Sequence, residues 1–166
     1  MVYKTLTALL ILFTSLSCQS QFQSVGIALG GGGAKGAAHI GVLKVLDALN
    51  IDIDYISGTS IGAIIGGLYA AGYTPEEIED IFFSMDWNKI LSGKRILSEL
   101  EKAFDAKNCK TFEDLKIPFR CVAFNSETGE EVVMSKGPLA IAIRASMSIP
   151  KVYETVHYNG MLLWDG

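Results

Sequence analysis

The sequence contains few of the residues on which structural metal sites and nucleic-acid interfaces depend. Its 166 residues include 3 Cys and 2 His, and no group of these has the spacing of zinc ligands, so we predict no metal. There are 14 Lys and Arg against 18 Asp and Glu, which gives a net charge of −4 with the positive charges scattered along the chain. Because this pattern lacks the basic patch of a nucleic-acid-binding protein, we expect no nucleic acid among the partners.

Long hydrophobic runs are also absent. The N-terminal stretch Thr5–Leu16 has 12 residues, whereas crossing a bilayer takes about 20. The basic residue Lys4 precedes this stretch, and small residues at 15–17 and a Gln- and Ser-rich run at 19–24 follow it. This order is typical of an export signal, which we assign to residues 1–20, with a buried first helix as the alternative. We therefore expect the protein in the bacterial periplasm, the cell envelope or the medium.

Each of the few cysteines lies in a different setting. Cys18 follows Leu16-Ser17, which loosely resembles a bacterial lipoprotein cleavage site, so a lipid anchor on Cys18 is a further hypothesis. Cys121 lies in the apolar run 119–124, as a buried small hydrophobic residue does, whereas Cys109 lies in a polar stretch. Export permits disulfides, and the sequence leaves open both a Cys109–Cys121 bridge and two free thiols.

Composition and periodicity indicate one α/β domain over residues 25–166. The chain is 49% hydrophobic and 19% charged, as globular proteins are. Alternating strand and helix patterns predict a mainly parallel sheet with antiparallel additions late in the chain. The predicted strands are 25–29, 51–57, 119–125, 131–135, 155–158 and 161–164, and the predicted helices are 37–49, 61–71, 74–85, 98–104 and 138–146, with a short one after Thr111.

Two local signals place element boundaries within this pattern. Thr74-Pro75-Glu76-Glu77 combines an N-cap residue, a proline at the first helical position and a glutamate three residues after the cap, which predicts a helix start. Asn159-Gly160 lies between two short strand patterns and predicts a tight hairpin turn.

The first glycine motif, Gly31-Gly32-Gly33-Ala34-Lys35-Gly36, lies between a predicted strand and a predicted helix. Such a loop aims backbone N–H groups at an anion, which is either a phosphate or a transient oxyanion. The spacing also matches the dinucleotide fingerprint, but that fingerprint requires an acidic residue at the end of the second strand. Asp52 and Asp54 lie at its beginning instead. A Walker loop is excluded because Ala37-Ala38 follow Gly36 where Lys and Ser or Thr are required.

The second glycine motif, Gly58-Thr59-Ser60-Ile61-Gly62, also joins a predicted strand to a predicted helix. A nucleophile elbow has this form, because its serine occupies a strained turn that only small neighbours permit. The alternative is a serine that caps a packed helix, which explains neither flanking glycine. Ser60 is therefore the candidate nucleophile.

A base for Ser60 is harder to find among the histidines. His39 falls in the helix after the glycine loop and His157 in a hairpin strand, and neither is framed like a catalytic base. Asp165-Gly166 closes a predicted strand, in a position from which a carboxylate can face outward. An aspartate is a weak base, with a pKa near ~4, so a dyad would depend on a strong oxyanion-binding loop.

Taken in order, these motifs resemble those of the patatin-like phospholipases of bacterial type. The stretches Ala38–Leu43 and Arg144–Pro150 also look like members of that family. The resemblance implies a three-layer α/β/α fold with Ser60 as nucleophile, Asp165 as base and the amides of Gly31, Gly32 and Gly33 as the oxyanion hole. It also identifies Gly36, Gly58, Gly62 and Gly166 as glycines of the family's three motifs. It also implies lipid or phospholipid ester substrates, contact with a membrane surface, and neither metal nor organic cofactor.

The family pattern continues beyond the Asp165-Gly166 turn, where the sequence stops. We therefore expect an incomplete domain whose base frays near the chain end, and little esterase activity from these 166 residues compared with a longer natural chain. Three alternatives to an active hydrolase remain: a catalytically impaired fragment, a non-catalytic lipid-binding envelope protein of the same fold, and a nucleotide-binding protein.

Overall fold

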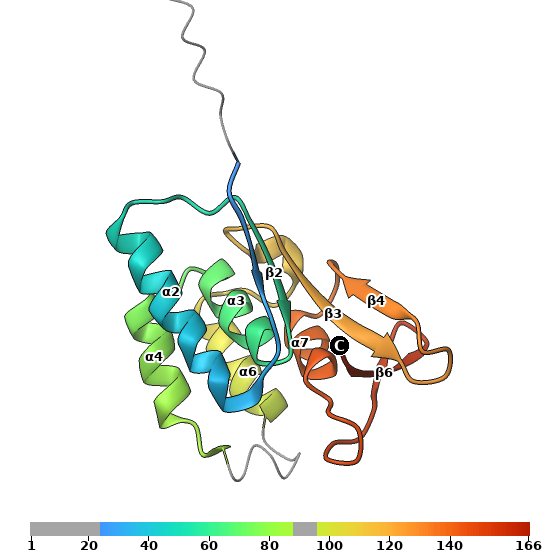
Figure 1. Ribbon diagram of the computed structural model, residues 1–166. Helices are drawn as coiled ribbons and strands as arrows, with labels where there is room; N and C mark the ends of the chain where they lie inside the picture. Colours follow the sequence, from blue (N-terminus) through green and yellow to red (C-terminus); the bar gives the residue numbers. More distant parts are fainter. Residues whose placement is uncertain (1–23, 88–95) are drawn as a thin grey trace, which may run out of the picture.

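Three neighbouring strands of the sheet are parallel in the computed structural model, which describes residues 24–87 and 96–166. β1 (Gly26–Leu29) pairs with β2 (Tyr55–Thr59), and β2 pairs with β3 (Phe119–Asn125), both in parallel (Figure 1). In sheets of this kind, ligand sites form outside the carboxyl ends of the strands. The proposed export signal, residues 1–20, lies outside the described residues.

Antiparallel strands from the C-terminal part of the chain complete the sheet. β4 (Glu131–Met134) and β6 (Met161–Asp165) both pair with β3, and β5 (Val156–Tyr158) pairs with β6. Between β5 and β6, Asn159 and Gly160 have φ of 47° and 79°, the positive values that a tight type I′ hairpin turn requires. The hairpin prediction is confirmed, and so is the α/β fold with a mainly parallel sheet and late antiparallel additions.

The helices next to the sheet lie on one of its faces. α3 (Ile61–Ala70) is small and apolar all round, and it packs against β2 and β3 with nearly all of its residues buried. α7 (Leu139–Ser146) packs beside it against β3, β5 and β6. A β-carbon on Gly67 of α3 would lie 2.5 Å from Ile143 of α7 and 3.6 Å from the ring of Phe119, so both helices share this face.

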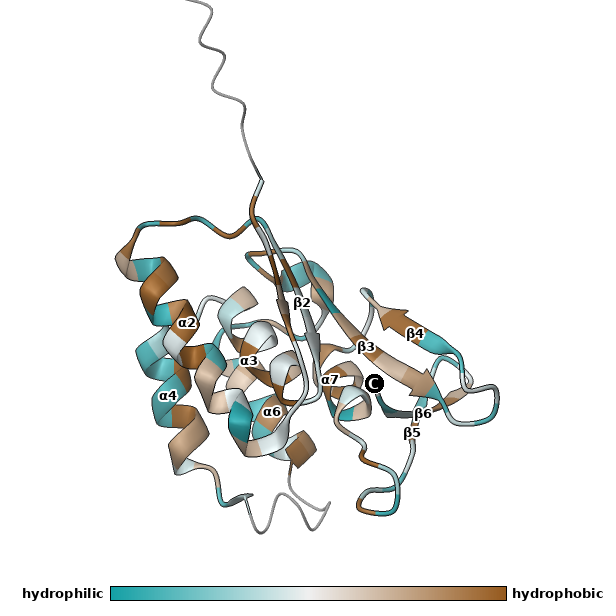
Figure 2. Cartoon of the chain, in the orientation of Figure 1, coloured by the Kyte–Doolittle hydropathy of each residue, from teal (hydrophilic) through white to brown (hydrophobic). Residues whose placement is uncertain are grey.

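Further helices pack outside this layer. α2 (Ala37–Ala48) and α4 (Pro75–Ser84) contact each other and α3, and both show hydrophobic and hydrophilic residues along their lengths (Figure 2). α6 (Ile96–Ala106) contacts α7. The predicted start of α4 is confirmed, because Thr74 and Glu77 form a reciprocal capping box with proline in the first turn.

The two faces of the sheet differ in exposure. Ile56, Phe119 and Cys121 are buried beneath the helices, whereas Tyr55 is 58% exposed and Val133 is 48% exposed on the other face. Of the three layers implied by the family resemblance, the described residues supply the sheet and the helical layer over its inner face.

Two elements differ from the sequence-based expectation by two or more residues at each end, whereas the others differ by at most one. The strand expected at 51–57 spans Tyr55–Thr59, because pairing with β1 starts only at Gly26↔Tyr55. Just before that point, the Asp54 carboxylate accepts a 2.7 Å hydrogen bond from the backbone N–H of Val25, and the Asp54 N–H donates a 2.8 Å hydrogen bond to the Val25 carbonyl oxygen. The helix expected at 98–104 is longer and spans Ile96–Ala106.

Both cysteines in the described residues are buried free thiols, Cys109 and Cys121. Burial raises the pKa of each thiol, most strongly that of Cys121, so neither is an activated nucleophile. Over residues 24–87 and 96–166, no helix has the length and apolar character that spanning a bilayer demands.

Candidate active site

Ser60 lies on a sharp turn between β2 and α3. Its backbone has φ 55° and ψ −123°, a region whose occupation costs a residue with a side chain about 1–3 kcal/mol. Although Ser60 is the N-cap residue of α3, its side chain makes no cap hydrogen bond. Helix capping therefore does not account for this serine, and the geometry is that of a nucleophile elbow.

The glycines that flank Ser60 lie where other backbone segments pass too close for a side chain. A β-carbon on Gly62 would lie 2.0 Å from the carbonyl oxygen of Leu29, and one on Gly58 would lie 2.5 Å from the carbonyl oxygen of Gly62. Both distances are shorter than any contact that a real β-carbon makes. The two glycines thus allow α3 to begin directly against the end of β1.

β3 aligns Asp165 with Ser60. β2 pairs with β3 as far as Thr59↔Val122, and the next residue of β3, Ala123, pairs with Asp165. Over these positions β4 occupies the other side of β3, so β2 and β6 lie end to end along the same side. The Ser60 hydroxyl accordingly donates a 2.7 Å hydrogen bond to Asp165 Oδ2.

The surroundings of Asp165 make its carboxylate a stronger base than an exposed one. Burial raises the pKa of Asp165, while hydrogen bonds from the Ser60 hydroxyl and the Gly166 backbone oppose that rise. Gly166 fits here because it lacks a side chain: a β-carbon on it would lie 2.6 Å from the carbonyl oxygen of Val122.

The first glycine motif forms a loop beside Ser60. A β-carbon on Gly31 would lie 3.3 Å from that of Ser60. Gly32 and Gly33 have φ of 151° and 57°, and they lead into the short 3-10 helix η1 (Gly33–Gly36). Gly33 lines the same cavity as Ser60. All three candidate oxyanion-hole residues therefore belong to a loop that adjoins the candidate nucleophile.

Contacts with the neighbouring helices hold this loop. A β-carbon on Gly36 would lie 2.5 Å from the side chain of Ile61, so the end of the loop packs directly on the first residue of α3. The ring nitrogen Nε2 of His39 lies 2.9 Å from the carbonyl oxygen of Gly30 and bonds to it. His39 thus supports the loop backbone, and His157 lies exposed on β5.

An apolar cavity of about 420 Å³ opens beside Ser60. The glycine loop, the beginnings of α2 and α3, the end of α4 and the segment after α7 form its walls. Apolar and aromatic side chains dominate its lining: Ile61, Phe82, Phe83, Trp87, Met147, Ile149 and Tyr153. A cavity of this kind suits a hydrocarbon chain better than a charged group.

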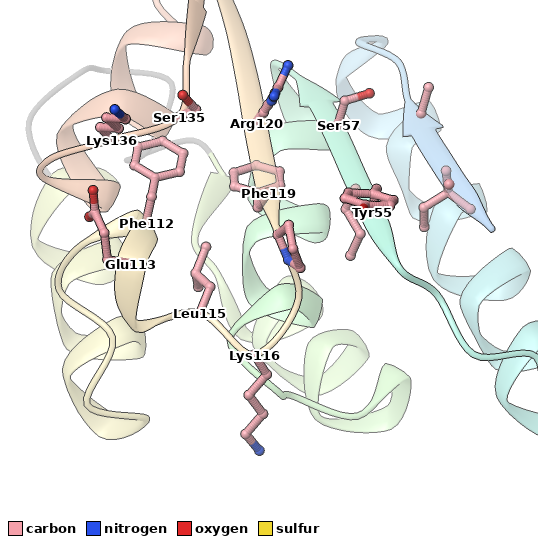
Figure 3. Close-up of a pocket in the computed structure, with 15 residues that line it drawn as sticks. Tyr55, Ser57, Phe112, Glu113, Leu115, Lys116, Phe119, Arg120, Ser135 and Lys136 are labelled. Atoms are coloured by element: carbon pink, nitrogen blue, oxygen red, sulfur yellow. The ribbon is translucent and has the colours of Figure 1, made fainter. Parts of the chain in front are cut away.

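A second cavity, of about 930 Å³, lies at the other end of the strands (Figure 3). The first residues of β1, β2 and β3 line it, together with Phe112 and Glu113 of the short 3-10 helix η2 (Phe112–Asp114). Tyr55, Ser57 and Arg120 are among its polar side chains (Figure 3). Neither Ser60 nor Asp165 lines this larger cavity.

The sequence alone assigns no role to the cavity walls or to Ser146. Phe82, Trp87 and Tyr153 do not belong to one shared element, and in the sequence only their aromatic character distinguishes them. Ser146, which accepts a hydrogen bond from the Ser60 backbone, lies in the stretch Arg144–Pro150, noted only for its family resemblance. In residues 24–87 and 96–166, no His, Cys, Asp and Glu side chains gather into a group able to hold a metal ion.

An α/β domain with a serine on a nucleophile elbow, an adjacent carboxylate and a glycine loop has the architecture shared by many serine hydrolases. This chain belongs to the patatin-like phospholipase family, whose family model matches residues 27–166. The resemblance inferred from the motifs is confirmed.

Relatives of known sequence are considerably longer than this chain. An uncharacterized NTE family protein of Mycobacterium tuberculosis is 37% identical over 158 residues, covering 86% of this chain and 42% of that protein. Lysophospholipase NTE1 of Saccharomyces cerevisiae is 34% identical over 160 residues, covering 87% of this chain and 9% of that protein. The chain thus spans less than half the length of these relatives.

Solved structures share the fold at low sequence identity. VipD from Legionella pneumophila matches with a TM-score of 0.70 and 16% identity, over 86% of this chain and 46% of that chain. ExoU from Pseudomonas aeruginosa, solved in complex with SpcU, matches with a TM-score of 0.62 and 20% identity, over 76% of this chain and 38% of that chain.

Proposed function

We propose that the protein is a serine acyl hydrolase that cleaves carboxylic ester bonds of phospholipids or other lipid esters through a Ser60–Asp165 dyad. The observation that carries this proposal is the 2.7 Å hydrogen bond from the Ser60 hydroxyl to Asp165 Oδ2, next to an apolar cavity. Family membership and the similarity to a lysophospholipase support a lipid ester as the substrate.

In the first step, Asp165 accepts the hydroxyl proton of Ser60 while Oγ attacks the ester carbonyl carbon. The carbonyl electron pair moves onto oxygen, and the backbone N–H groups of Gly31–Gly33 stabilise the negative charge that develops there. As the tetrahedral intermediate collapses, the bond to the alcohol breaks, and that alcohol leaves with the proton held by Asp165. The acyl group remains on Ser60.

In the second step, water replaces the alcohol. Asp165 takes a proton from the water as its oxygen attacks the acyl carbon, and the same loop stabilises the second oxyanion. Collapse of this intermediate breaks the bond to Ser60 Oγ, which recovers its proton from Asp165. The products are a carboxylic acid and the free enzyme, and no cofactor is consumed.

The apolar cavity supports a long acyl chain as the group that is transferred. Its aromatic and aliphatic walls begin at Ser60 itself, so a chain whose carbonyl carbon is at Oγ can place its methylenes inside. Burial of each methylene group contributes about 0.8 kcal/mol, which would make binding strongly dependent on chain length.

The mouth of this cavity supports contact with a lipid surface. Phe83 and Ile149 line the cavity and are 69% and 38% exposed, and the neighbouring Val152 is 52% exposed. Exposed apolar side chains around a substrate entrance can insert between lipid headgroups. Together with the export signal expected at residues 1–20, this favours action on lipids in the cell envelope or outside the cell.

The proposal is tested on the complete natural polypeptide that contains this sequence. A fluorophosphonate probe should label Ser60, and phosphatidylcholine vesicles should release free fatty acid, while the Ser60→Ala variant should show neither reaction. Fatty acid release that persists in Ser60→Ala would refute the dyad. Vesicle binding with neither labelling nor release would instead favour a non-catalytic lipid-binding protein.

A further inference from the structure

The end of α7 contacts both members of the proposed dyad. This helix finishes with Arg144-Ala145-Ser146, and the turn that follows contains Ser148. Arg144, Ser146 and Ser148 are polar but buried, and the serines are completely inaccessible to solvent. Every buried polar side-chain atom in the described residues has a hydrogen-bond partner, so these residues are committed to specific contacts.

Ser146 joins the nucleophile to the central strand. Its hydroxyl accepts a 3.0 Å hydrogen bond from the backbone N–H of Ser60 and donates a 2.5 Å hydrogen bond to the carbonyl oxygen of Val122. The hydroxyl thus connects Ser60, the first residue after β2, to Val122, the last residue of β3 with which β2 pairs.

This connection lies where β2 turns away from β3. The Ser60 backbone must leave the ladder to reach its positive φ of 55°. Without the Ser146 hydroxyl, the Ser60 N–H and the Val122 carbonyl would each lack this partner inside the protein. The Ser146 hydroxyl replaces the missing ladder bond with a bridge. It therefore stabilises the strained turn without touching the Ser60 hydroxyl.

The same segment also holds Asp165. The backbone N–H of Asp165 donates a 3.0 Å hydrogen bond to the carbonyl oxygen of Ser148. The Ser148 hydroxyl in turn bonds to Arg144 Nη1 and to the Arg144 carbonyl, and the Arg144 guanidinium lies 4.8 Å from the ring centre of Tyr153. Residues 144–148 therefore fix the backbone on both sides of the Ser60–Asp165 hydrogen bond.

We infer that Ser146 is a positioning residue for the reaction, whose hydroxyl holds the Ser60 backbone at the distance and angle from Asp165 that proton transfer requires. This inference rests on the proposed hydrolase function, and it assigns Ser146 no contact with the substrate. Removal of the hydroxyl leaves two backbone groups unsatisfied or allows β2 to relax toward β3. In both cases Ser60 Oγ moves relative to Asp165.

The test uses the complete natural polypeptide and measures how fast a fluorophosphonate labels Ser60 at increasing probe concentrations. Two quantities are compared between variants: the maximal labelling rate and the probe concentration that gives half of that rate. Ser146→Ala should lower the maximal rate about 10- to 100-fold, the effect of leaving a buried hydrogen-bonding group unsatisfied at the reacting residue. The half-saturating concentration should stay within about twofold of wild type, because the cavity is unchanged.

Ile143→Val is the matched control, because Ile143 lies on the same helix, is completely buried and hydrogen-bonds to neither dyad residue. Ile143→Val should lower Tm and leave the labelling rate at the wild-type value. Equal labelling rates for Ser146→Ala and Ile143→Val would overturn the inference. Should Ser146→Ala fail to fold, Ser146→Cys makes the same comparison, because its slightly larger thiol fills the site but hydrogen-bonds weakly. Absence of wild-type labelling at Ser60 would overturn the proposed function itself.

Discussion

The Ser60 hydroxyl reaches Asp165 at 2.7 Å although the two residues are 105 positions apart in the sequence. β3 makes this contact possible, because β2 ends beside Val122 and β6 ends beside Ala123 on the same side of that strand. A register shift of one residue between β6 and β3 would turn the Asp165 side chain to the other face of the sheet. Activity is therefore expected to depend on strand register as much as on the two side chains.

The dyad itself gives the first prediction. Ser60→Ala and Asp165→Asn should each lower kcat for a lipid ester by about 10²–10⁴-fold or more, since each removes the nucleophile or its general base. The circular dichroism spectrum should not change, because neither substitution alters the size of a packed side chain. Retention of more than a tenth of wild-type kcat by Asp165→Asn would show that another group serves as the base.

The raised pKa of Asp165 predicts that activity and stability change with pH in opposite directions. Because burial raises its pKa, the acid limb of kcat should lie above the ~4 of an ordinary aspartate. Since the pKa is higher in the folded than in the unfolded state, protonation favours folding: the stabilisation is full below the unfolded pKa and is lost as pH rises through the folded pKa. Asp165→Asn should therefore have a higher Tm than wild type at neutral pH, with a difference that shrinks on acidification. A difference that grows toward low pH would contradict the raised pKa.

The sequence predicted the turn at Ser60 because its signals are local. A serine between two glycines, after a strand and before a helix, favours an elbow, and the capping box of Thr74 and Glu77 is a local signal of the same kind. The element boundaries were less predictable, because they depend on where strands meet. β2 begins at Tyr55, where its pairing with β1 starts, and no periodicity of the sequence signals that point.

Long-range packing was beyond the reach of the sequence alone. The role of Ser146 depends on the end of α7 arriving at the β2–β3 ladder, and the aromatic wall of the cavity depends on α4 and the segment after α7 meeting beside Ser60. Serines and phenylalanines at such positions look like ordinary surface or core residues. Only their convergence in space distinguishes them.

The close approach at Gly62 predicts a severe loss of stability on substitution. In Gly62→Ala, the new β-carbon would lie 2.0 Å from the carbonyl oxygen of Leu29, which is backbone and cannot move aside without breaking β1. We expect the protein to be destabilised by about 3–5 kcal/mol or more and to be recovered mainly in insoluble form. Gly41→Ala, on α2 with no atom within 4 Å of the new β-carbon, is the control and should be as stable as wild type or about 0.5–1 kcal/mol more so. A soluble Gly62→Ala protein with wild-type Tm would show that β1 and α3 are farther apart.

The cavity predicts how acyl-chain selectivity can be changed. Ala37, the first residue of α2, lines the cavity, so Ala37→Leu should fill part of it. The ratio of kcat/KM for a sixteen-carbon to a four-carbon p-nitrophenyl ester should fall about tenfold or more, as expected for the loss of two or so buried methylenes at about 0.8 kcal/mol each. Ala48→Leu, at the exposed end of the same helix, should leave the ratio unchanged. If both variants behave alike, the acyl chain binds elsewhere.

The exposed side chains at the cavity mouth predict a difference between lipid surfaces and dissolved substrates. Phe83→Ser combined with Val152→Ser removes two exposed apolar groups and leaves Ser60, Asp165 and the glycine loop untouched. Hydrolysis of phosphatidylcholine vesicles should fall about tenfold or more, because each lost side chain contributes about 1.5–3 kcal/mol when it is buried in lipid. Hydrolysis of a dissolved four-carbon ester should fall much less, because that substrate never has to leave a bilayer and its short chain fills little of the cavity that Phe83 lines.

The matched control is Val45→Ser on α2 combined with Leu49→Ser at the C-cap that follows it, two positions that are 57% and 63% exposed and do not line the cavity. These substitutions remove a comparable apolar surface elsewhere, so a general effect of surface hydrophobicity on vesicle binding would appear equally in both double variants. Vesicle cosedimentation measured alongside hydrolysis separates weaker surface binding from slower turnover. If the control loses as much vesicle activity as the variant at the mouth, Phe83 and Val152 do not form the contact with lipid. Another surface of the protein must then face the membrane.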